Sequence, residues 1–249
     1  PPDDQRLEAE RVPRRVRRYR AELLLALLLG LACAAAWAWF APGERARLTP
    51  AEVDGYIARL QGKLPAPPEE QRIALERLRA WGLADDGQPV YMLNLMRYYP
   101  TLRAVPGGEA IALSPQAANA YYERSVMPLL LQRGGWPMVG GERGGITLAD
   151  GVHADLFGPD ASADGLDRVL VVRYPSRRAF LDLVSDPRYL ALAPYKFAAL
   201  HLALVPVAGA TALPDPRWLV MAAAVIAFLA FGWWRSARAP QKPHGKRYQ

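Results

Sequence analysis

The chain has 249 residues and carries 31 Lys and Arg against 24 Asp and Glu, which gives a formal net charge of +7. This length allows one or two globular domains and excludes a large multidomain assembly. One cysteine excludes an intrachain disulfide and a cysteine-rich metal site, and three histidines leave little for a histidine-based one. We therefore expect neither a metal nor a cofactor.

Two apolar runs predict membrane-spanning helices, which we place at 21–41 and 217–234. Residues 21–40 carry one charge, that of Glu22, and residues 218–234 carry none. As a helix the first run is about 30 Å long, which matches the hydrocarbon core of a bilayer, and the second lies at the short end of the spanning range. Tryptophans lie at the ends of the runs, as is typical of a membrane–water interface.

The first run has two alternative interpretations, a cleaved signal peptide and a lipidation site at Cys33. The run is longer than the usual apolar region of a signal peptide. Gly30 and Leu31 fit a lipidation motif poorly, and apolar sequence continues beyond Cys33. We favour a retained span.

The distribution of charge predicts the orientation. Residues 1–20 carry seven Arg against four acids, residues 235–249 carry five bases and no acid, and between the spans 19 bases face 19 acids. By the positive-inside rule both termini are cytoplasmic, and the central part lies in the periplasm, beside a bacterial inner membrane. The tails lack aromatic residues interleaved with the bases and a folded basic module, so we expect a lipid bilayer as partner and no nucleic acid.

These patterns divide the chain into seven segments. They are a cytoplasmic basic tail (1–20), a transmembrane helix (21–41), a helical connector (42–84), an extracytoplasmic domain (85–208), a linker (209–216), a second transmembrane helix (217–234) and a second cytoplasmic basic tail (235–249).

Residues 42–84 are expected to form two helices. Thr49, Pro50 and Glu52 match a capping box with proline at the first helical position. The segment 62–68 (GKLPAPP) interrupts the helical pattern, which then restarts at Pro68. The two helices either connect the first span to the domain, which we favour, or form a lid over it.

The central domain alternates strand and helix patterns in the order β-α-β-β-α-β. This order predicts an α+β domain of the ferredoxin-like type. Strands are expected at 90–96, 136–139, 146–148, 153–157, 168–174 and 202–207, and helices at 115–132, 176–183 and 187–200.

The two strongest strand segments, VYMLNLM and RVLVVRY, are apolar on both faces. An antiparallel sheet with one face in water alternates apolar and polar residues. The helices of a ferredoxin-like fold cover only one sheet face, so the other needs a separate cover. We expect a homodimer, or docking on another membrane-complex subunit, through this apolar sheet face.

Three segments, PVYMLNLMRYYP, YYERSVMPLLLQRGG and DRVLVVRYPSRRAFLDLVSDPRYLALAPYKFAAL, resemble short bacterial proteins of unknown function in the dimeric α+β barrel superfamily. The resemblance covers 88–207 and implies a ferredoxin-like subunit whose sheet packs on that of its mate. The superfamily includes cofactor-free monooxygenases and haem-handling enzymes. Such proteins often carry His-Arg near the end of the second helix, where this chain has Tyr195 and Lys196, so the same chemistry is not implied here.

Asn94 and Arg173 are polar residues within apolar strands. A buried amide must be hydrogen-bonded, so Asn94 either faces a ligand cavity or is satisfied by the structure around it. Arg173 either binds an anionic group or forms an ion pair with Glu123 or Asp182.

Tyr122 and Tyr189 are the remaining candidates for a ligand-binding site, with aromatic core packing as the alternative. His153 is expected to be a surface or structural histidine and not a ligand.

The sequence carries no nucleotide-binding, nucleophile-elbow or zinc-protease motif. We therefore expect a membrane-anchored accessory, assembly or small-ligand-binding protein without catalysis of its own. The alternative is a cofactor-independent monooxygenase or a haem-handling enzyme that acts on a hydrophobic substrate.

Overall fold

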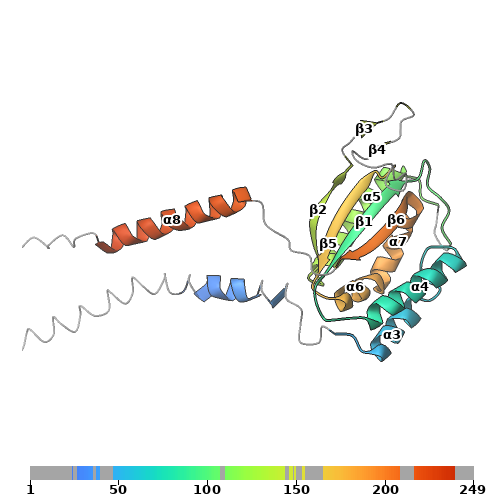
Figure 1. Ribbon diagram of the computed structural model, residues 1–249, viewed down its shortest axis with the longest axis horizontal. Coiled ribbons are helices and arrows are strands. Elements are labelled where there is room, and N and C mark those ends of the chain that lie inside the picture. The colour runs from blue at the N-terminus through green and yellow to red at the C-terminus, as the bar shows by residue number, and fades with distance from the viewer. Residues whose placement is uncertain are drawn as a thin grey trace, which may run out of the picture. The chain divides into compact units, whose positions relative to one another are not determined.

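The computed structural model describes residues 24, 27–35, 38–39, 47–106, 110–143, 146–147, 149, 153–154, 165–207 and 216–238. Two compact units are present, Pro1–Gly209 and Ala210–Gln249. The first unit has the predicted α+β fold and contains a four-stranded antiparallel sheet (Figure 1).

The sheet has the strand order β2-β5-β1-β6, and every neighbouring pair is antiparallel. Strands β3 and β4 form a separate two-stranded hairpin. The elements in chain order are α3 (Pro50–Leu60), α4 (Pro68–Leu83), β1 (Val90–Tyr98), α5 (Pro115–Leu131), β2 (Trp136–Glu142), β3 (Ile146–Thr147), β4 (His153–Ala154), β5 (Arg168–Tyr174), α6 (Arg177–Val184), α7 (Pro187–Ala199), β6 (Leu200–Val207) and α8 (Pro216–Arg238).

The predicted strand at 168–174 is confirmed residue for residue as β5, and the predicted strand at 90–96 is confirmed as β1, which continues to Tyr98. The extension follows from pairing, because Tyr98 lies opposite Leu200 of β6. Strand β2 likewise continues beyond the predicted 136–139 to Glu142, which lies opposite Arg168. The ends of strands that are extended by pairing with distant strands cannot be predicted from the local sequence. Of the strand predicted at 153–157, only 153–154 belong to the described residues.

The predicted capping box at the start of α3 is confirmed. Thr49 Oγ1 accepts a hydrogen bond from the Glu52 amide at 3.3 Å, and Glu52 Oε2 accepts one from the Thr49 amide at 2.9 Å. The Glu52 carboxylate also accepts hydrogen bonds of 2.8 and 2.9 Å from the Arg178 guanidinium on α6. The bonds from Arg178, with those from Thr49, lower the pKa of Glu52 to about 2. One carboxylate therefore caps α3 and ties it to α6.

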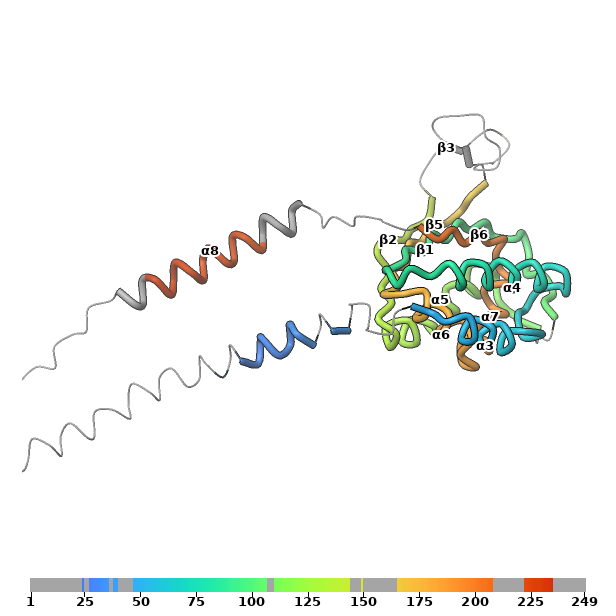
Figure 2. The backbone as a smooth tube through the Cα atoms, turned by 60° about the horizontal axis from the view of Figure 1, so that its bottom comes forward, coloured from blue at the N-terminus to red at the C-terminus, as the bar shows by residue number. Residues whose placement is uncertain are grey.

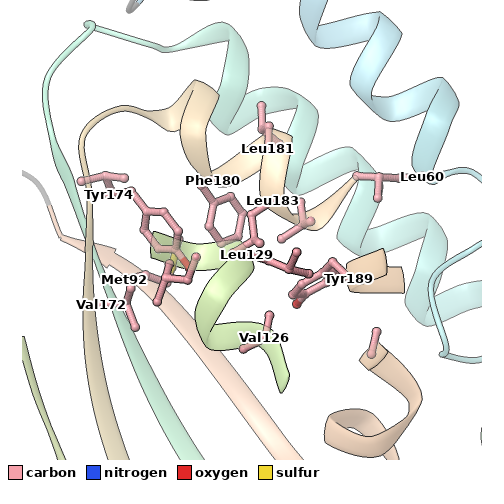
Figure 3. Packing of buried hydrophobic residues seen from close by; sticks show 14 of the residues in the cluster. Leu60, Met92, Val126, Leu129, Val172, Tyr174, Phe180, Leu181, Leu183 and Tyr189 are labelled. Atoms are coloured by element: carbon pink, nitrogen blue, oxygen red, sulfur yellow. The ribbon is translucent and has the colours of Figure 1, made fainter. Parts of the chain in front are cut away.

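Helices α3 to α7 lie on one side of the sheet (Figure 2). Helices α3 and α4 contribute to the core there: Leu60 is fully buried, and Trp81 packs edge-on against Phe180 with 5.4 Å between ring centroids. Tyr56 donates a hydrogen bond to the Asp182 carboxylate on α6. Figure 3 shows the side chains of this cluster converging from the helices and the sheet. They include Leu60, Met92, Val126, Leu129, Val172, Tyr174, Phe180, Leu181, Leu183 and Tyr189.

None of helices α3 to α7 lies over the other sheet face (Figure 2). Burial alternates along β1, where Val90 and Met92 are buried while Leu93 and Leu95 are only partly so. Because Leu93 lies between Val171 of β5 and Val205 of β6, apolar side chains run across three strands of the open face. We call this surface the open face. Its apolar residues are Tyr91, Leu93, Leu95, Val139, Val169, Val171, Ala203, Val205 and Val207.

Both segments predicted to span a membrane contain described helical residues, namely 24, 27–35 and 38–39 in the first and α8 in the second. Within the described part of the chain, no helix combines the length and the apolarity that a membrane crossing requires.

Leu60→Ala tests whether α3 belongs to the folded core. Removing a fully buried leucine leaves a cavity, so we expect the free energy of unfolding to fall by about 2–5 kcal/mol. Urea unfolding of the detergent-solubilised chain, followed by tryptophan fluorescence, measures this change. The matched control is Leu83→Ala at the exposed end of α4, which should change it by less than about 0.5 kcal/mol. Equal effects of the two substitutions would show that α3 does not contribute to the core.

Candidate functional site

A cavity of about 280 Å³ lies between the helical face of the sheet and α5. Its wall is mostly apolar and contains side chains from both layers. The apolar lining residues include Val126, Met127, Leu130, Leu170, Val172 and Leu183. The polar lining residues are Asn94, Tyr122, Glu123, Arg168, Tyr174 and Lys196. A small cavity that combines apolar side chains with convergent polar groups is the usual form of a ligand site.

Lys196 reaches this cavity from α7 because of its position on the helix. Tyr189, Ala193, Lys196 and Ala199 are buried and follow one another at spacings of four, three and three residues, so they share one face of the helix. Its side chain is therefore turned toward the sheet, and only 7% of the residue is exposed. A lysine this deeply buried is rare in proteins unless it is paired or functional.

Asn94 is the hydrogen-bond partner of Lys196. The Lys196 ammonium donates to Asn94 Oδ1 at 3.0 Å. The Asn94 amide nitrogen donates to the carbonyl oxygens of Met92 and Leu170, both at 3.1 Å. Because the backbone of β1 and β5 engages the amide nitrogen, the amide oxygen is left to face the lysine. Asn94 is therefore held in position by the sheet and serves as a fixed acceptor.

The Lys196 side chain makes a second favourable contact, with an aromatic ring. Its Nζ atom lies 5.2 Å from the centroid of the Tyr122 ring. The Tyr122 hydroxyl in turn donates to the Tyr189 hydroxyl at 3.3 Å. Burial raises the pKa of both tyrosines, so they stay neutral and cannot balance the charge of the lysine.

The carboxylate in the cavity wall is already paired. Glu123 on α5 accepts hydrogen bonds of 2.8 and 2.9 Å from the Arg168 guanidinium, and a further one of 3.0 Å from the Asn119 amide. Arg168 also contacts the exposed Glu142 at 2.8 Å. Glu123 and Arg168 form an ion pair within the lining, and Lys196 is the charged lining residue that has no ion-pair partner among the described residues.

Burial lowers the pKa of Lys196 from an ordinary value of 10.5 to about 8, and the nearby charge of Glu123 opposes this shift only in part. Burial acts in this direction because the charged form loses its hydration. A lysine whose pKa lies close to neutral pH can act either as a cation that binds an oxygen or as an uncharged amine.

The structure brings together three of the four residues that the sequence predicts for a site. Asn94 and Tyr122 line the cavity, and Tyr189 contacts Tyr122 from α7. Arg173 does not join them, because its neighbours Val172 and Tyr174 point into the core and Arg173 lies in the register of the open face. Of the acids suggested for it, Glu123 binds Arg168 and Asp182 accepts from Tyr56.

Lys196 is the residue that sequence reasoning did not include in the site. One signal in the sequence points to it, namely its position on the apolar face of a helix. The register between α7 and β1, which sets the lysine against Asn94, follows only from the tertiary structure.

A second, larger cavity of about 670 Å³ lies under α4. Ile73, Leu78 and Trp81 line it from α4, and Met92 and Tyr189 line it from the core. Its lining is almost entirely apolar, with Glu70 and Arg77 as the charged exceptions.

The fold and the site together define an α+β protein with a buried lysine at a small cavity on the helical face of its sheet. No family model and no curated protein matches the chain. A crystal structure of RPA0582, a protein of unknown function from Rhodopseudomonas palustris, is 25% identical to it with a TM-score of 0.44 and matches 59% of this chain and 98% of RPA0582. The structure of methylated RPA0582 is 26% identical with a TM-score of 0.45, over 59% of this chain and 95% of that one.

The lowered pKa of Lys196 predicts a pH-dependent stability. Between pH 8 and 10.5 the unfolded chain binds a proton that the folded chain does not, so stability rises with pH in this window. We compare the free energy of unfolding of the unchanged protein with that of Lys196→Met. The difference between them should grow by about 3 kcal/mol in favour of the unchanged protein from pH 7 to pH 10.5. Urea unfolding at a series of pH values measures the difference. Lys63→Met replaces an exposed lysine and keeps Lys196, so its stability should follow the same pH dependence as the unchanged protein. If the stability of Lys196→Met rose with pH in parallel with that of the unchanged protein, the lowered pKa of Lys196 would be contradicted.

Proposed function

We propose that the protein is a membrane-anchored, dimeric, small-ligand-binding protein of the bacterial periplasm, whose domain is of the ferredoxin-like, dimeric α+β barrel type. The observation that carries the proposal is the buried Lys196 at the wall of a cavity. The ligand is a small, mostly apolar molecule with one oxygen acceptor, which binds with that oxygen toward Lys196.

Three features of the cavity support this ligand class. Lys196 has three donor hydrogens when charged, and within the described residues Asn94 is the one group that accepts from it. An oxygen of the ligand would use a second donor and offset the charge of Lys196. The walls around the polar end are apolar, so the rest of the ligand is apolar as well. Burying a cation with so few partners is unfavourable, and a bound oxygen relieves this penalty.

The proposal of a dimer rests on the open face. Val139, Val205 and Val207 on this surface are exposed, and Leu93 and Val171 lie between them in the sheet. A continuous apolar surface of this kind is typical of an interaction site. The strand order, with two β-α-β units in one antiparallel sheet, supports the ferredoxin-like assignment of the domain. In the proposed dimer, the sheet of the second copy covers the open face.

The proposal of membrane anchoring rests on the sequence of the two apolar runs, on the bases that flank them and on exposed apolar side chains. Lipid provides a suitable cover for the exposed apolar side chains of these helices. The exposed residues are Leu24, Leu27, Leu28, Leu29 and Leu31 in the first run, and Val225, Ile226, Phe228, Leu229, Phe231, Trp233 and Trp234 in α8.

Binding of hexanoate to the full chain in lipid nanodiscs tests the ligand site. We expect saturable binding by calorimetry, because the carboxylate accepts from Lys196 while the short chain contacts the apolar wall. Lys196→Met should weaken it at least about tenfold, the usual effect of losing a hydrogen bond to a charged group. Lys63→Met is the control and should bind as the unchanged protein does. Absence of saturable binding, or equal binding by both variants, would contradict the proposal.

Native mass spectrometry of the detergent-extracted chain tests the dimer. We expect two copies per particle, and we expect Val205→Glu to give monomers because it places a charge within the apolar interface. Leu83→Glu, which adds the same charge at an exposed leucine of α4, should leave the dimer intact. A monomeric unchanged protein would refute the dimer.

The topology is tested by single cysteines in a Cys33→Ser background. A membrane-impermeant maleimide should label Lys63→Cys in intact spheroplasts, because this position lies in the proposed periplasmic part. Ser236→Cys, in the proposed cytoplasmic tail, should be labelled only after lysis. Labelling of both positions in intact cells would contradict the orientation.

A further inference from the structure

The Lys196 side chain has the surroundings of a reactive amine. Its nitrogen lies at the wall of the 280 Å³ cavity, and its hydrogen-bond partner is the neutral Asn94 amide at 3.0 Å. Among the described residues, Lys196 forms no ion pair, because Glu123 is engaged by Arg168. When uncharged, the amine donates one hydrogen to Asn94 and keeps its second hydrogen and its lone pair for the cavity.

We propose that Lys196 captures a small apolar aldehyde in this cavity as a reversible imine. This inference rests on the proposed ligand site and names the chemical class of its ligand. The aldehyde oxygen first occupies the oxygen position beside Lys196, which places the carbonyl carbon next to the amine nitrogen.

The cavity favours an aldehyde over other carbonyl compounds for steric reasons. At about 280 Å³ the cavity is slightly smaller than most ligand sites, and side chains such as Val126, Leu130 and Leu170 line it. An aldehyde carries only hydrogen on one side of its carbonyl carbon, so the nitrogen approaches with the least displacement of these walls. The apolar lining binds the hydrocarbon part of the molecule.

The reaction needs no further reagent. The nitrogen lone pair forms a bond to the carbonyl carbon, the C=O π pair moves to oxygen, and oxygen takes up a proton that nitrogen releases. The resulting carbinolamine loses its hydroxyl group together with the second nitrogen hydrogen as water, which leaves a C=N bond. Nothing is oxidised or reduced, and addition of water reverses each step.

The charge state of the lysine supports this chemistry. With its pKa lowered to about 8 by burial, roughly a quarter of the amine is uncharged at pH 7.5, against roughly one part in a thousand for an ordinary lysine. The charged groups that face it are Glu123 and Arg168, which pair with each other, and the tyrosine facing it, Tyr122, is neutral. The charge of Glu123 favours the protonated lysine, but burial has the larger effect and keeps the pKa lowered.

Reductive trapping tests the proposal in the full chain in nanodiscs. The chain has four lysines, Lys63, Lys196, Lys242 and Lys246, so three of them serve as internal controls. We expect limiting hexanal with cyanoborohydride at pH 7.5 to attach one hexyl group to Lys196 at least about tenfold faster than to Lys63, as measured by peptide mapping. Excess hexanoate should slow the labelling of Lys196 and leave that of Lys63 unchanged.

Two variants separate this proposal from the ligand site on which it rests. Lys196→Arg keeps the positive charge but cannot form an imine, so it should retain hexanoate binding and lose the rapid labelling. Lys63→Met should keep both hexanoate binding and the rapid labelling of Lys196. Equal labelling of all four lysines, or no labelling of Lys196 in a protein that binds hexanoate, would overturn covalent capture and leave the ligand site standing. Absence of both labelling and hexanoate binding would overturn both.

Discussion

Strand β1 imposes the constraint on which the rest of the domain depends. It is paired on both edges, with β5 and β6, and it carries apolar side chains on both faces. Helices α3 to α7 cover one face (Figure 2), and Met92 and Val172 are buried there. Leu93 and Val171 lie on the other face, where they are only partly buried and none of these five helices covers them. The hydrophobic effect that builds the core on one side thus leaves an apolar surface on the other.

The same strand positions the site. Asn94 is the one polar residue on the buried face of β1, and its amide nitrogen is held by backbone carbonyls. It therefore presents a rigid acceptor to Lys196, the one lysine in the described core. A buried cation lowers the stability of the folded state, and Asn94 and the Tyr122 ring compensate only in part. A destabilising feature of this kind, here a buried and incompletely compensated charge, is expected at functional sites.

Local patterns in the sequence were sufficient for the elements of the fold. The continuous apolar run of β5 and the capping box at Thr49 each depend on residues close together in the chain, and each is confirmed. The ends of β1 and β2 were underestimated because pairing with distant strands extends them. Asn94 and Tyr122 were identified because a polar or aromatic residue stands out in an apolar element.

The sequence by itself determined the α+β class, the order of strands and helices, and the apolar character of both sheet faces. Only the tertiary structure decided that Arg173 lies away from the cavity, that Arg168 neutralises Glu123, and that Lys196 meets Asn94. The physical reason is that periodicity places a side chain on one face of its own element. Which charged groups meet across two elements depends on how helix and sheet pack, and burial then sets the pKa of Lys196.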